Sequence, residues 1–498
     1  MKTLLTTLNS RHIHSNLAIR YLYCCCKKNF PQLTVQEFTI NQNPDYCLGE
    51  IFRGGHGAVC FSCYIWNITA TLKLIANLKK VSPNSAIILG GPEVSFDPEE
   101  IMRLNPAVDY IIIGEGEITF KELLAFLAKG QGEPAHIEGL TYRQGNGIKT
   151  TPARPLIADL GQIPFPYTEE DLPALNNRII YYESSRGCPF GCSYCLSSTL
   201  QGVRFFPLKR VKQDLKFFLD AGVKQVKFVD RTFNVKRSRS LEIMRWLHEH
   251  DNGHTNFHFE MVADLLDEET LDFLQDVRPG LFQLEIGVQT TNPHTLQAIH
   301  RTGDLPQLSR VIKILKSRAN IHLHLDLIAG LPCEDYASFK QSFNHVYALR
   351  PDNLQLGFLK LLKGTPIREN KALHGYVYRD DPPYEVLANK YLRFADMLRL
   401  KGMEEMLELY SNSGHFTFAL HYALDRHYAE PADFFEDLSK YWEAKGHHHA
   451  AHKKTEQYHI LLRFYANKNL PDREIFSEIL KLDFLSHNKD HLPSLANN

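Results

Sequence analysis

The sequence predicts an α/β protein with a doubly wound, Rossmann-like N-terminal domain, a partial (β/α)6 barrel of the TIM type and an α-helical C-terminal extension. Three observations carry this prediction. Short apolar runs alternate with amphipathic stretches over about the first 130 residues, the alternation resumes at Ile179, and beyond Pro366 the pattern becomes helical and aromatic. We expect domains at 1–132, 176–370 and 371–498, with a connector at 133–175.

The N-terminal domain is predicted from five short apolar strands separated by amphipathic stretches. Strands of this kind form parallel sheets with helices on both faces, and ligands bind beyond the carboxyl ends of the strands. The strands are expected at 3–8, 34–38, 58–62, 86–89 and 110–113, with helices at 68–80 and 117–129 among others.

Unusual residues follow three of these strands, at the edge where a ligand is expected. Glycines at strand ends would let a large flat ligand approach the backbone closely, but they would equally serve tight strand-to-helix turns. The candidates are Ser62, Tyr64, Ile65, Trp66 and Asn67 after the third strand, Gly90, Gly91, Pro92 and Glu93 after the fourth, and Gly114, Glu115, Gly116 and Glu117 after the fifth.

Two further features of this half are interpreted as structural. Cys24, Cys25 and Cys26 lie on a helix pattern, where consecutive side chains point about 100° apart and cannot converge on one metal. We interpret them as packing residues. In the connector, Gly145-Asn146-Gly147 predicts a small hairpin.

Cys188, Cys192 and Cys195 form the most specific motif of the chain. They lie in a loop rich in Gly and Pro after the apolar run 179–182, and such a loop can turn all three sulfurs toward one point. Three thiolates suit an iron–sulfur cluster or a zinc ion, and a four-iron cluster so held keeps one iron without a protein ligand. A structural zinc site would normally need a fourth Cys or His nearby, and the next cysteine is Cys333. The spacing favours a cluster and leaves zinc as the alternative.

The pattern C-x3-C-x2-C, with Tyr194 before the last cysteine, resembles the signature of the radical S-adenosylmethionine (SAM) enzymes. In that family the open iron of a 4Fe-4S cluster chelates SAM, and an electron from the cluster cleaves SAM to a 5′-deoxyadenosyl radical. The resemblance implies that Cys188, Cys192 and Cys195 are the cluster ligands and that the Tyr194 backbone lies near the adenine.

The barrel is predicted from strand patterns at 179–184, 224–229, 256–261, 281–286, 321–328 and 353–358. Functional groups of such barrels gather at the carboxyl ends of the strands. Polar residues stand there in this sequence, although each one alone could have a structural role. We expect Asp230 and Glu260 to be catalytic, and the other strand-end residues are Glu285, Gln289 and Asp326.

Three of these strand ends resemble radical SAM motifs. Residues 228–233 are similar to the motif near the SAM amino group. Residues 285–290, with Glu285 and Gln289, resemble the segment that reaches the ribose or carboxylate of SAM. The run that contains Asp326, Ile328 and Gly330 resembles the adenine motif. The resemblance therefore implies SAM contacts for these residues.

The N-terminal domain resembles the cobalamin-binding domain that precedes the radical SAM core in one large subgroup. The sequences GGP at 90–92 and GEGE at 114–117 stand at that family's positions. The motif D-x-H-x-x-G, whose histidine ligates cobalt, is absent. His12 and His14 follow the first strand and are interpreted as hydrogen-bonding loop residues. We therefore expect cobalamin bound base-off, with no protein histidine on cobalt.

The C-terminal extension is predicted to be helical at 384–400, 404–411, 416–427, 431–445 and 459–465, and to cap the barrel. His447, His448, His449 and His452 could bind a metal, but a solvated loop is favoured because they follow a helix end at Gly446. The last twelve residues are polar and predicted to be frayed.

The composition bears on location and partners. The chain has 56 basic and 57 acidic residues, so no surplus of positive charge points to nucleic acid. Ten cysteines without a secretory signal sequence favour a reducing compartment. No apolar run approaches the ~20 residues of a membrane helix. We expect a cytoplasmic protein without a membrane or nucleic-acid partner.

These resemblances imply a cobalamin-dependent radical SAM enzyme, most simply a C-methyltransferase with a reductant such as flavodoxin or ferredoxin. One SAM would methylate cob(I)alamin, and the radical from a second would activate a carbon that takes this methyl group. The alternatives are a rearrangement or cyclisation, a cobalamin or redox sensor without catalysis, and a zinc module. The sequence does not name the substrate.

Trp66 carries one further hypothesis. Its loop should lie along the ligand edge of the sheet. Tyr64, Ile65 or Trp66 would then pack against the lower face of the corrin and keep water from cobalt. The alternative is that Trp66 covers the core of its own domain.

Overall fold

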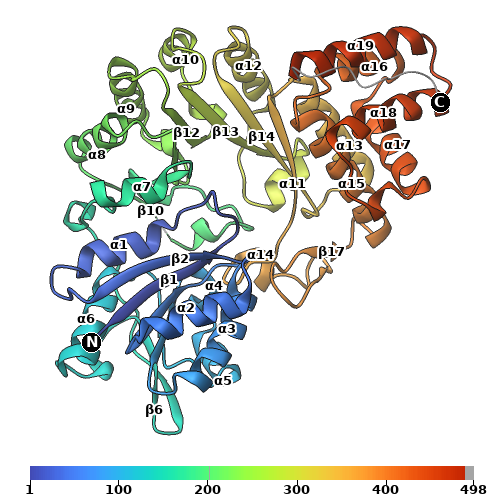
Figure 1. The fold of residues 1–498 in the computed structure, drawn as a ribbon. Coiled ribbons are helices and arrows are strands. Elements are labelled where there is room, and N and C mark those ends of the chain that lie inside the picture. Colours follow the sequence, from blue (N-terminus) through green and yellow to red (C-terminus); the bar gives the residue numbers. More distant parts are fainter. Residues whose placement is uncertain (201, 488–498) are drawn as a thin grey trace.

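The structure, a computed structural model, describes residues 1–200 and 202–487. Figure 1 shows an N-terminal sheet flanked by helices (blue), a curved sheet ringed by helices (green to yellow) and a group of helices toward the C-terminus (orange to red). The mixed α/β architecture with a helical C-terminal region is the one that the sequence predicts.

The N-terminal sheet has the strand order β2-β1-β3-β4-β5-β6-β7. The five expected strands are present and pair in parallel. The hairpin predicted in the connector is also present, and its first strand pairs antiparallel with β5, so it extends this sheet. The strands are β1 (Thr3–Asn9), β2 (Leu33–Thr39), β3 (Ala58–Ser62), β4 (Ala86–Gly90), β5 (Tyr110–Ile112), β6 (Leu140–Gln144) and β7 (Gly147–Thr150).

Apolar clusters lie on both faces of this sheet. The adjacent residues Leu4 and Leu5 of β1 belong to different clusters, as the alternation of side chains along a strand requires. Cys26 is fully buried in one cluster and Cys25 packs against it, which agrees with a packing role. The helices are α1 (Leu17–Cys26), α2 (Pro44–Gly54), α3 (Ile68–Val81), α4 (Pro92–Ser95), α5 (Pro98–Leu104) and α6 (Glu117–Lys129), with α7 (Leu172–Leu175) in the connector.

The second sheet is an open barrel of six parallel strands in the order β15-β14-β13-β12-β11-β8. A separate antiparallel hairpin, β9 (Ser185–Cys188) and β10 (Gly202–Phe205), follows the first barrel strand. The barrel strands are β8 (Ile180–Tyr182), β11 (Gln225–Phe228), β12 (Asn256–Met261), β13 (Phe282–Gln289), β14 (His322–Ala329) and β15 (Asn353–Phe358). The helices are α8 (Leu208–Asp220), α9 (Arg237–Glu249), α10 (Glu268–Gln275), α11 (Pro293–Ala298), α12 (Leu305–Lys316) and α13 (Tyr336–Ala348).

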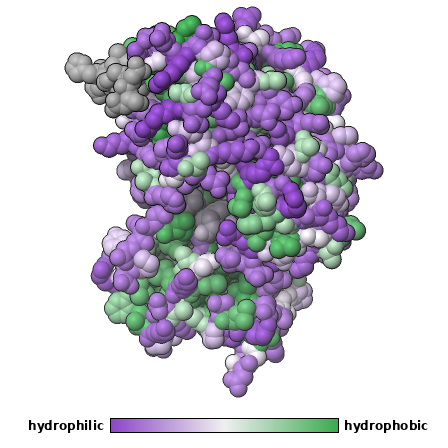
Figure 2. Space-filling view, turned by 90° about the vertical axis from the view of Figure 1, so that its right-hand side faces the viewer, coloured by the Kyte–Doolittle hydropathy of each residue, from purple (hydrophilic) through white to green (hydrophobic). Residues whose placement is uncertain are grey.

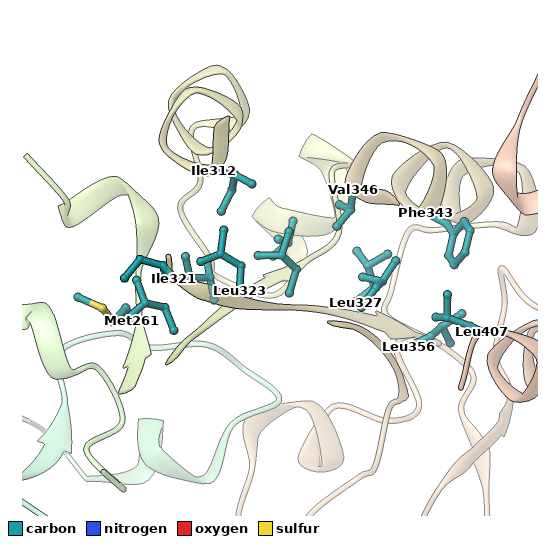
Figure 3. Close-up of a cluster of buried hydrophobic side chains, with 14 of the residues drawn as sticks. Met261, Ile312, Ile321, Leu323, Leu327, Phe343, Val346, Leu356 and Leu407 are labelled. Atoms are coloured by element: carbon teal, nitrogen blue, oxygen red, sulfur yellow. The ribbon is translucent and has the colours of Figure 1, made fainter. Parts of the chain in front are cut away.

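The two faces of the barrel strands differ in polarity. Along β13 and β14, buried residues alternate with partly exposed ones. The buried set is apolar and packs against the surrounding helices. Figure 3 shows Leu323 and Leu327 of β14 opposite Ile312 of α12 and Val346 of α13. The other set is mostly polar and faces the inside of the barrel. The apolar residues of these strands therefore pack under the helices, and the residues able to bind a ligand lie inside the barrel.

The C-terminal region is helical, but one helix begins later than the sequence predicts. Tyr384 has a positive φ of 58°. The side chain of Asn389 accepts hydrogen bonds from the backbone N–H groups of Tyr391 and Leu392. This stretch therefore forms a strand and a turn instead of helix. The elements are α14 (Pro366–Glu369), β16 (Val377–Tyr378), β17 (Val386–Ala388), α15 (Phe394–Met406), a π-helical turn (Leu407–Asn412), α16 (Thr417–His427), α17 (Pro431–Ala444), α18 (Lys454–Asn467) and α19 (Arg473–His487).

The histidines of this region form a local turn. The Nε2 atom of His452 lies 2.8 Å from the carbonyl oxygen of His447, and both rings pack edge-on against Trp442. Among the described residues, no group of three or more His, Cys, Asp or Glu side chains is arranged to hold one metal ion. The predicted frayed end, apart from His487, lies outside the described residues.

Within the described part of the chain, no helix combines the length and the apolar character that crossing a membrane would require.

Candidate functional site

The carboxyl ends of the N-terminal strands face the mouth of the barrel. The loop after β1 runs beside β8, since the backbone N–H of Ile179 donates to the carbonyl of Ile13 at 2.8 Å. Figure 2 shows a hollow between the N-terminal domain below and the rest of the molecule above, with hydrophobic side chains gathered on the lower side. The two groups of residues predicted to bind cofactors thus open toward one space.

The cysteine loop begins on the β9–β10 hairpin, where Cys188 pairs with Gly202. Gly187, directly before Cys188, has a φ of +99°, and a Cβ atom there would lie 2.1 Å from the carbonyl oxygen of Gly202. Only glycine allows the two strands to approach this closely. The hairpin therefore fixes where the first thiol stands.

The other two thiols follow in a turn that is tied to the barrel at both sides. The backbone N–H of Cys195 donates to the carbonyl of Cys192 at 3.1 Å. Between them, Ser193 donates its N–H to Ile299 and accepts from Ile367, each at 3.0 Å. All three cysteines are free thiols.

Two residues that sequence reasoning missed lie against these sulfurs. The Oγ1 atom of Thr232 is 3.7 Å from the Cys188 sulfur, and the Arg301 guanidinium donates to the Cys192 sulfur at 3.8 Å. Burial raises the pKa of the Cys192 thiol, and the charge of Arg301 opposes that rise. Donors around sulfur are what a thiolate-bound cluster needs from its surroundings. Thr232 lies within residues 228–233, which resemble a radical SAM motif, but nothing in the sequence singles it out, and Arg301 stands in no motif that marks it.

The cysteine loop fits a cluster better than it fits one ion. Its three thiols are not arranged around a single metal position in the described chain. A 4Fe-4S cluster binds each thiolate through a separate iron, so its ligands need not converge on one atom. The ligand assignment of Cys188, Cys192 and Cys195 stays a prediction.

The inside of the barrel holds a network of charged side chains. Glu285 is paired with Lys227 at 2.8 Å and with His258 at 2.9 Å, and His324 lies 3.2 Å from Asp326. Burial alone would raise the pKa of Glu285, but contact with His258 and the charge of Lys227 lower it to about 2. Glu285 is therefore ionised at neutral pH.

Glu260 is the exception in this network. Its carboxyl group makes no hydrogen bond or ion pair with any described residue. Burial raises its pKa to about 7, while the charge of Arg231 opposes that rise and the charge of Glu285 adds to it. A carboxyl group that titrates near neutral pH inside a barrel is a candidate proton donor or acceptor. This placement supports the catalytic role predicted for Glu260.

Asp230, the other predicted catalytic residue, has a different environment. It is 1% exposed and accepts hydrogen bonds from the Ser184 backbone, the Ser184 hydroxyl and the Ser185 hydroxyl at 2.8, 2.7 and 2.5 Å. A carboxylate whose acceptor sites are filled in this way holds the chain that leads to the cysteine loop. We therefore reassign Asp230 from catalysis to positioning.

The loop after β3 combines one structural residue with two ring side chains. Asn67 is fully buried, and its side-chain amide donates to the carbonyl oxygens of Leu8 and Ser62. Tyr64 and Trp66 stack with ring centroids 4.4 Å apart, and Trp66 is 47% exposed. Trp66 is thus not a core residue, whereas Asn67 fixes the loop from inside.

The loop after β4 serves a tight turn and a contact with a distant segment. A Cβ atom on Gly91 would lie 2.4 Å from the carbonyl oxygen of Cys63, and the φ of Gly91 is +114°. Glu93 is 6% exposed and accepts a hydrogen bond from the hydroxyl of Tyr384. The Glu93 carboxylate, predicted to contact a cofactor, is therefore engaged with the C-terminal half of the chain, while Gly90 and Pro92 frame the turn.

The loop after β5 forms ion pairs with the hairpin that carries Cys188. Arg204 lies 2.7 Å from Glu115, and Arg186 lies 2.6 Å from Glu117 and 3.3 Å from Glu115. Glu115 also accepts from the backbone N–H of Ile157 at 2.8 Å. These carboxylates join two domains, and Gly114 and Gly116 are the residues of this loop left for a flat ligand.

His12 and His14 take part in contacts between the domains. The Nδ1 atom of His14 is 2.7 Å from the Tyr181 hydroxyl, and His12 is 3.4 Å from the Arg178 guanidinium. Burial lowers the pKa of His14, and the charges of Arg11 and Lys227 lower it further. Both rings are hydrogen-bonding loop residues, as interpreted from the sequence.

The remaining predicted SAM contacts lie at the barrel mouth. Gln289 has a φ of +71° at a bulge of β13, and its buried Oε1 atom has no partner among the described residues. A strained residue with an unpaired oxygen is typical of a ligand site. Gly330 has a φ of +95°, Ile328 and Tyr194 are partly buried, and Asp326 also points into the barrel.

Three parts of the chain match known protein families. Residues 4–124 match the B12 binding domain family, residues 182–346 the Radical SAM superfamily, and residues 372–498 a protein family of unknown function, DUF4080. The chain thus carries a match to a B12-binding domain followed by a match to a radical SAM domain.

Relatives of the chain include proteins named as methyltransferases. It is 29% identical over 312 residues to the uncharacterized methyltransferase PH0819 of Pyrococcus horikoshii, covering 58% of this chain and 64% of the relative. It is 26% identical over 363 residues to the cobalamin-dependent radical SAM methyltransferase TokK of Streptomyces tokunonensis, covering 68% and 53%. The matches thus span about half to two thirds of these relatives.

A comparison of folds finds similarity to a solved structure over almost the whole chain. The structure of the cobalamin-dependent S-adenosylmethionine radical enzyme OxsB with aqua-cobalamin bound has a TM-score of 0.67 and 15% identity, over 97% of this chain and 80% of OxsB. At that identity the likeness concerns the fold, and it includes the helical C-terminal region.

Proposed function

We propose that the protein is a cobalamin-dependent radical SAM enzyme that methylates an unactivated carbon of a small molecule. The observation that supports this most is that the strand-end loops of the B12-binding domain and the cysteine loop open toward the same space. The matches to relatives named as methyltransferases cover 58% and 68% of this chain. A methyl group held at one domain has to reach a carbon held at the other.

The residues present suit the groups that this function requires. Cys188, Cys192 and Cys195 would hold three irons of a 4Fe-4S cluster, with Thr232 and Arg301 beside the sulfurs. Gln289, Asp326, Ile328, Gly330 and the Tyr194 backbone would contact SAM. When bound, the cluster and SAM supply a radical that removes hydrogen, and cobalamin supplies the methyl group.

On the cobalamin side, the glycines of the strand-end loops and the Tyr64–Trp66 stack would lie against the corrin. Trp66 is exposed at this edge, so covering it with a flat apolar ligand would remove an aromatic surface from water. We propose no protein histidine on cobalt, because His12 and His14 are hydrogen-bonded elsewhere.

The barrel interior supports a polar substrate. The charged side chains of its network are paired with one another, except for the carboxyl group of Glu260, which forms no hydrogen bond or ion pair with described residues. A buried carboxyl that lacks a partner favours a ligand with a hydroxyl or amine. Glu260 would orient such a group and could exchange a proton with it.

A reductant such as flavodoxin or ferredoxin and a cytoplasmic location are parts of the same proposal. The cluster has to be reduced from outside, and its thiolates require a reducing compartment.

Replacement of each cluster cysteine by alanine tests the assignment. After anaerobic reconstitution, Cys188→Ala, Cys192→Ala and Cys195→Ala should lose the four-iron cluster and SAM cleavage yet bind cobalamin as the wild type does, because the two sites lie on separate sheets. Iron counting and cobalamin titration give the answer. A variant that kept a full cluster would refute its ligand role, and a product heavier by one methylene per turnover would support methylation.

A further inference from the structure

One segment of the C-terminal half contacts all three parts of the site. We call residues 359–393, between β15 and α15, the clasp segment. Ile367 donates its backbone N–H to Ser193 of the cysteine loop at 3.0 Å, and Asn389 donates its side-chain amide to Gly330 at the end of β14 at 2.9 Å. Its third contact is with the loop after β4 of the B12-binding domain. Figure 1 shows α14 of this segment beside α4.

The third contact is a buried hydrogen bond between residues 291 positions apart. The hydroxyl of Tyr384 donates to Glu93 in α4, and the two residues are 4% and 6% exposed. The Lys363 ammonium lies 3.8 Å from the same carboxylate and 3.7 Å from Asp97. A buried carboxylate that meets both a hydroxyl and a cation is held in one direction, which apolar packing alone does not achieve.

Tyr384 is held in place from its own side before it meets Glu93. Its carbonyl accepts from the backbone N–H of Leu361 at 3.0 Å. The Arg368 guanidinium lies 4.5 Å from the centroid of the Tyr384 ring and donates to the carbonyl of Leu361 at 2.6 Å. The ring and the backbone of Tyr384 are therefore fixed by the clasp segment itself.

Beside this hydrogen bond, the clasp segment and the loop after β4 approach each other closely. Gly364 has a φ of +77°, and a Cβ atom there would lie 2.1 Å from the ring of Phe96. The backbone of the clasp segment thus packs against the aromatic ring that follows α4. Loop 90–97 is enclosed between β4 on one side and the clasp segment on the other.

We propose that Tyr384 is a positioning residue that acts through Glu93 to hold loop 90–97, and with it the ligand edge of the B12-binding domain, at a fixed distance from the barrel. This inference rests on the proposed function, in which groups from both domains act on one substrate. It assigns a role to part of the DUF4080 region, within which Tyr384 falls.

Loss of this contact should affect one of the two reactions of SAM and not the other. SAM cleavage needs only the cysteine loop and the barrel. Transfer of a methyl group from SAM to cobalamin also needs the ligand edge of the B12-binding domain to be held at a fixed distance from the barrel. Loss of the Tyr384 hydroxyl should therefore impair the second process and spare the first. A general loss of folded protein would lower both equally.

Hydrogen–deuterium exchange of the protein without cofactors tests the contact itself. We expect the amides of residues 90–97 to exchange about tenfold faster or more in Tyr384→Phe, since a buried hydrogen bond to a carboxylate is lost. Tyr378→Phe is the matched control, because its hydroxyl accepts from Lys371 at 3.0 Å within the clasp segment and does not reach the N-terminal domain. The double variant Tyr384→Phe with Glu93→Gln should exchange no faster than the faster single variant. Unchanged exchange in Tyr384→Phe would overturn the proposal.

The reconstituted enzyme tests the positioning role. With hydroxocobalamin, SAM and a chemical reductant, Tyr384→Phe should form S-adenosylhomocysteine several-fold more slowly than the wild type and 5′-deoxyadenosine at the same rate. An equal fall of both products would overturn the role. If the wild type binds no cobalamin, the proposed function fails, and the exchange experiment still decides whether Tyr384 holds loop 90–97.

Discussion

At the scale of single residues, the site separates groups that hold the fold from groups left for a ligand. Asp230 and Asn67 were predicted to touch a cofactor or substrate, yet their polar atoms are taken up inside the protein. The carboxyl group of Glu260 has no such partner among the described residues, and the Trp66 ring is 47% exposed. The sequence marks all four as unusual, but it does not reveal the hydrogen bonds that separate them, because most of the partners lie far along the chain.

Glu260 should make stability depend on pH. Its pKa in the folded protein is about 7, above the ordinary 4.5, so the folded state binds the proton more tightly than the unfolded state. Its contribution is therefore most favourable below about pH 4.5, is lost as the pH rises toward about 7 and is constant above. Relative to wild type, Glu260→Gln should gain free energy of unfolding over that range, by up to about 3 kcal/mol.

Chemical denaturation between pH 4.5 and pH 8 measures this difference. Asp272→Asn, at an exposed carboxylate of α10, is the control and should give a flat difference. A flat difference for Glu260→Gln as well would contradict the burial of an unpaired carboxyl group.

Trp66→Ala should weaken cobalamin binding with little effect on stability. Truncation of a buried tryptophan costs about 3–5 kcal/mol, but Trp66 is 47% exposed and is stacked mainly on Tyr64. Cobalamin titration and thermal unfolding separate the two effects. Phe52→Ala, at a 52% exposed ring of α2, is the control and should leave the affinity unchanged. A large drop in melting temperature with unaltered affinity would favour a core role.

At the scale of elements, the periodicity of the sequence was sufficient to predict the strands but not the segments that connect them. The parallel strands of the two sheets were predicted to within a few residues, because each is either a short apolar run or an alternation of apolar and polar residues. The segment around Tyr384 was predicted as helix and is not, since Asn389 closes a turn there. The ion pairs of Glu115 and Glu117 with Arg186 and Arg204 join residues 69 to 89 positions apart, which no local pattern records.

The β9–β10 hairpin gives a prediction at this scale. Gly187→Ala should open the hairpin, since the new Cβ would meet the carbonyl oxygen of Gly202, and the variant should retain much less cluster iron although all three cysteines remain. Gly191→Ala changes another glycine of the same loop, where a Cβ atom would meet nothing within 4 Å, and should keep its iron. Iron and sulfide analysis after reconstitution compares them, and equal iron in the two variants would contradict the geometric role of Gly187.

At the scale of the whole molecule, three of the strand-end loops of the B12-binding domain are tied to the rest of the chain. The loop after β1 is bound to β8, the loop after β4 to the clasp segment and the loop after β5 to the hairpin of Cys188. The loop after β3 keeps the ring of Trp66 47% exposed. These contacts join the B12-binding domain to the barrel next to both predicted cofactor sites. This arrangement supports a single reaction that uses both cofactors.

The measurement that tests this account most directly follows two products of SAM in one reaction. The reconstituted protein, supplied with cobalamin, SAM and a reductant under anaerobic conditions, should form both 5′-deoxyadenosine and S-adenosylhomocysteine, and Cys192→Ala should lose the first. Formation of 5′-deoxyadenosine without S-adenosylhomocysteine, in protein that retains bound cobalamin, would contradict a methyltransferase in which the two domains act together.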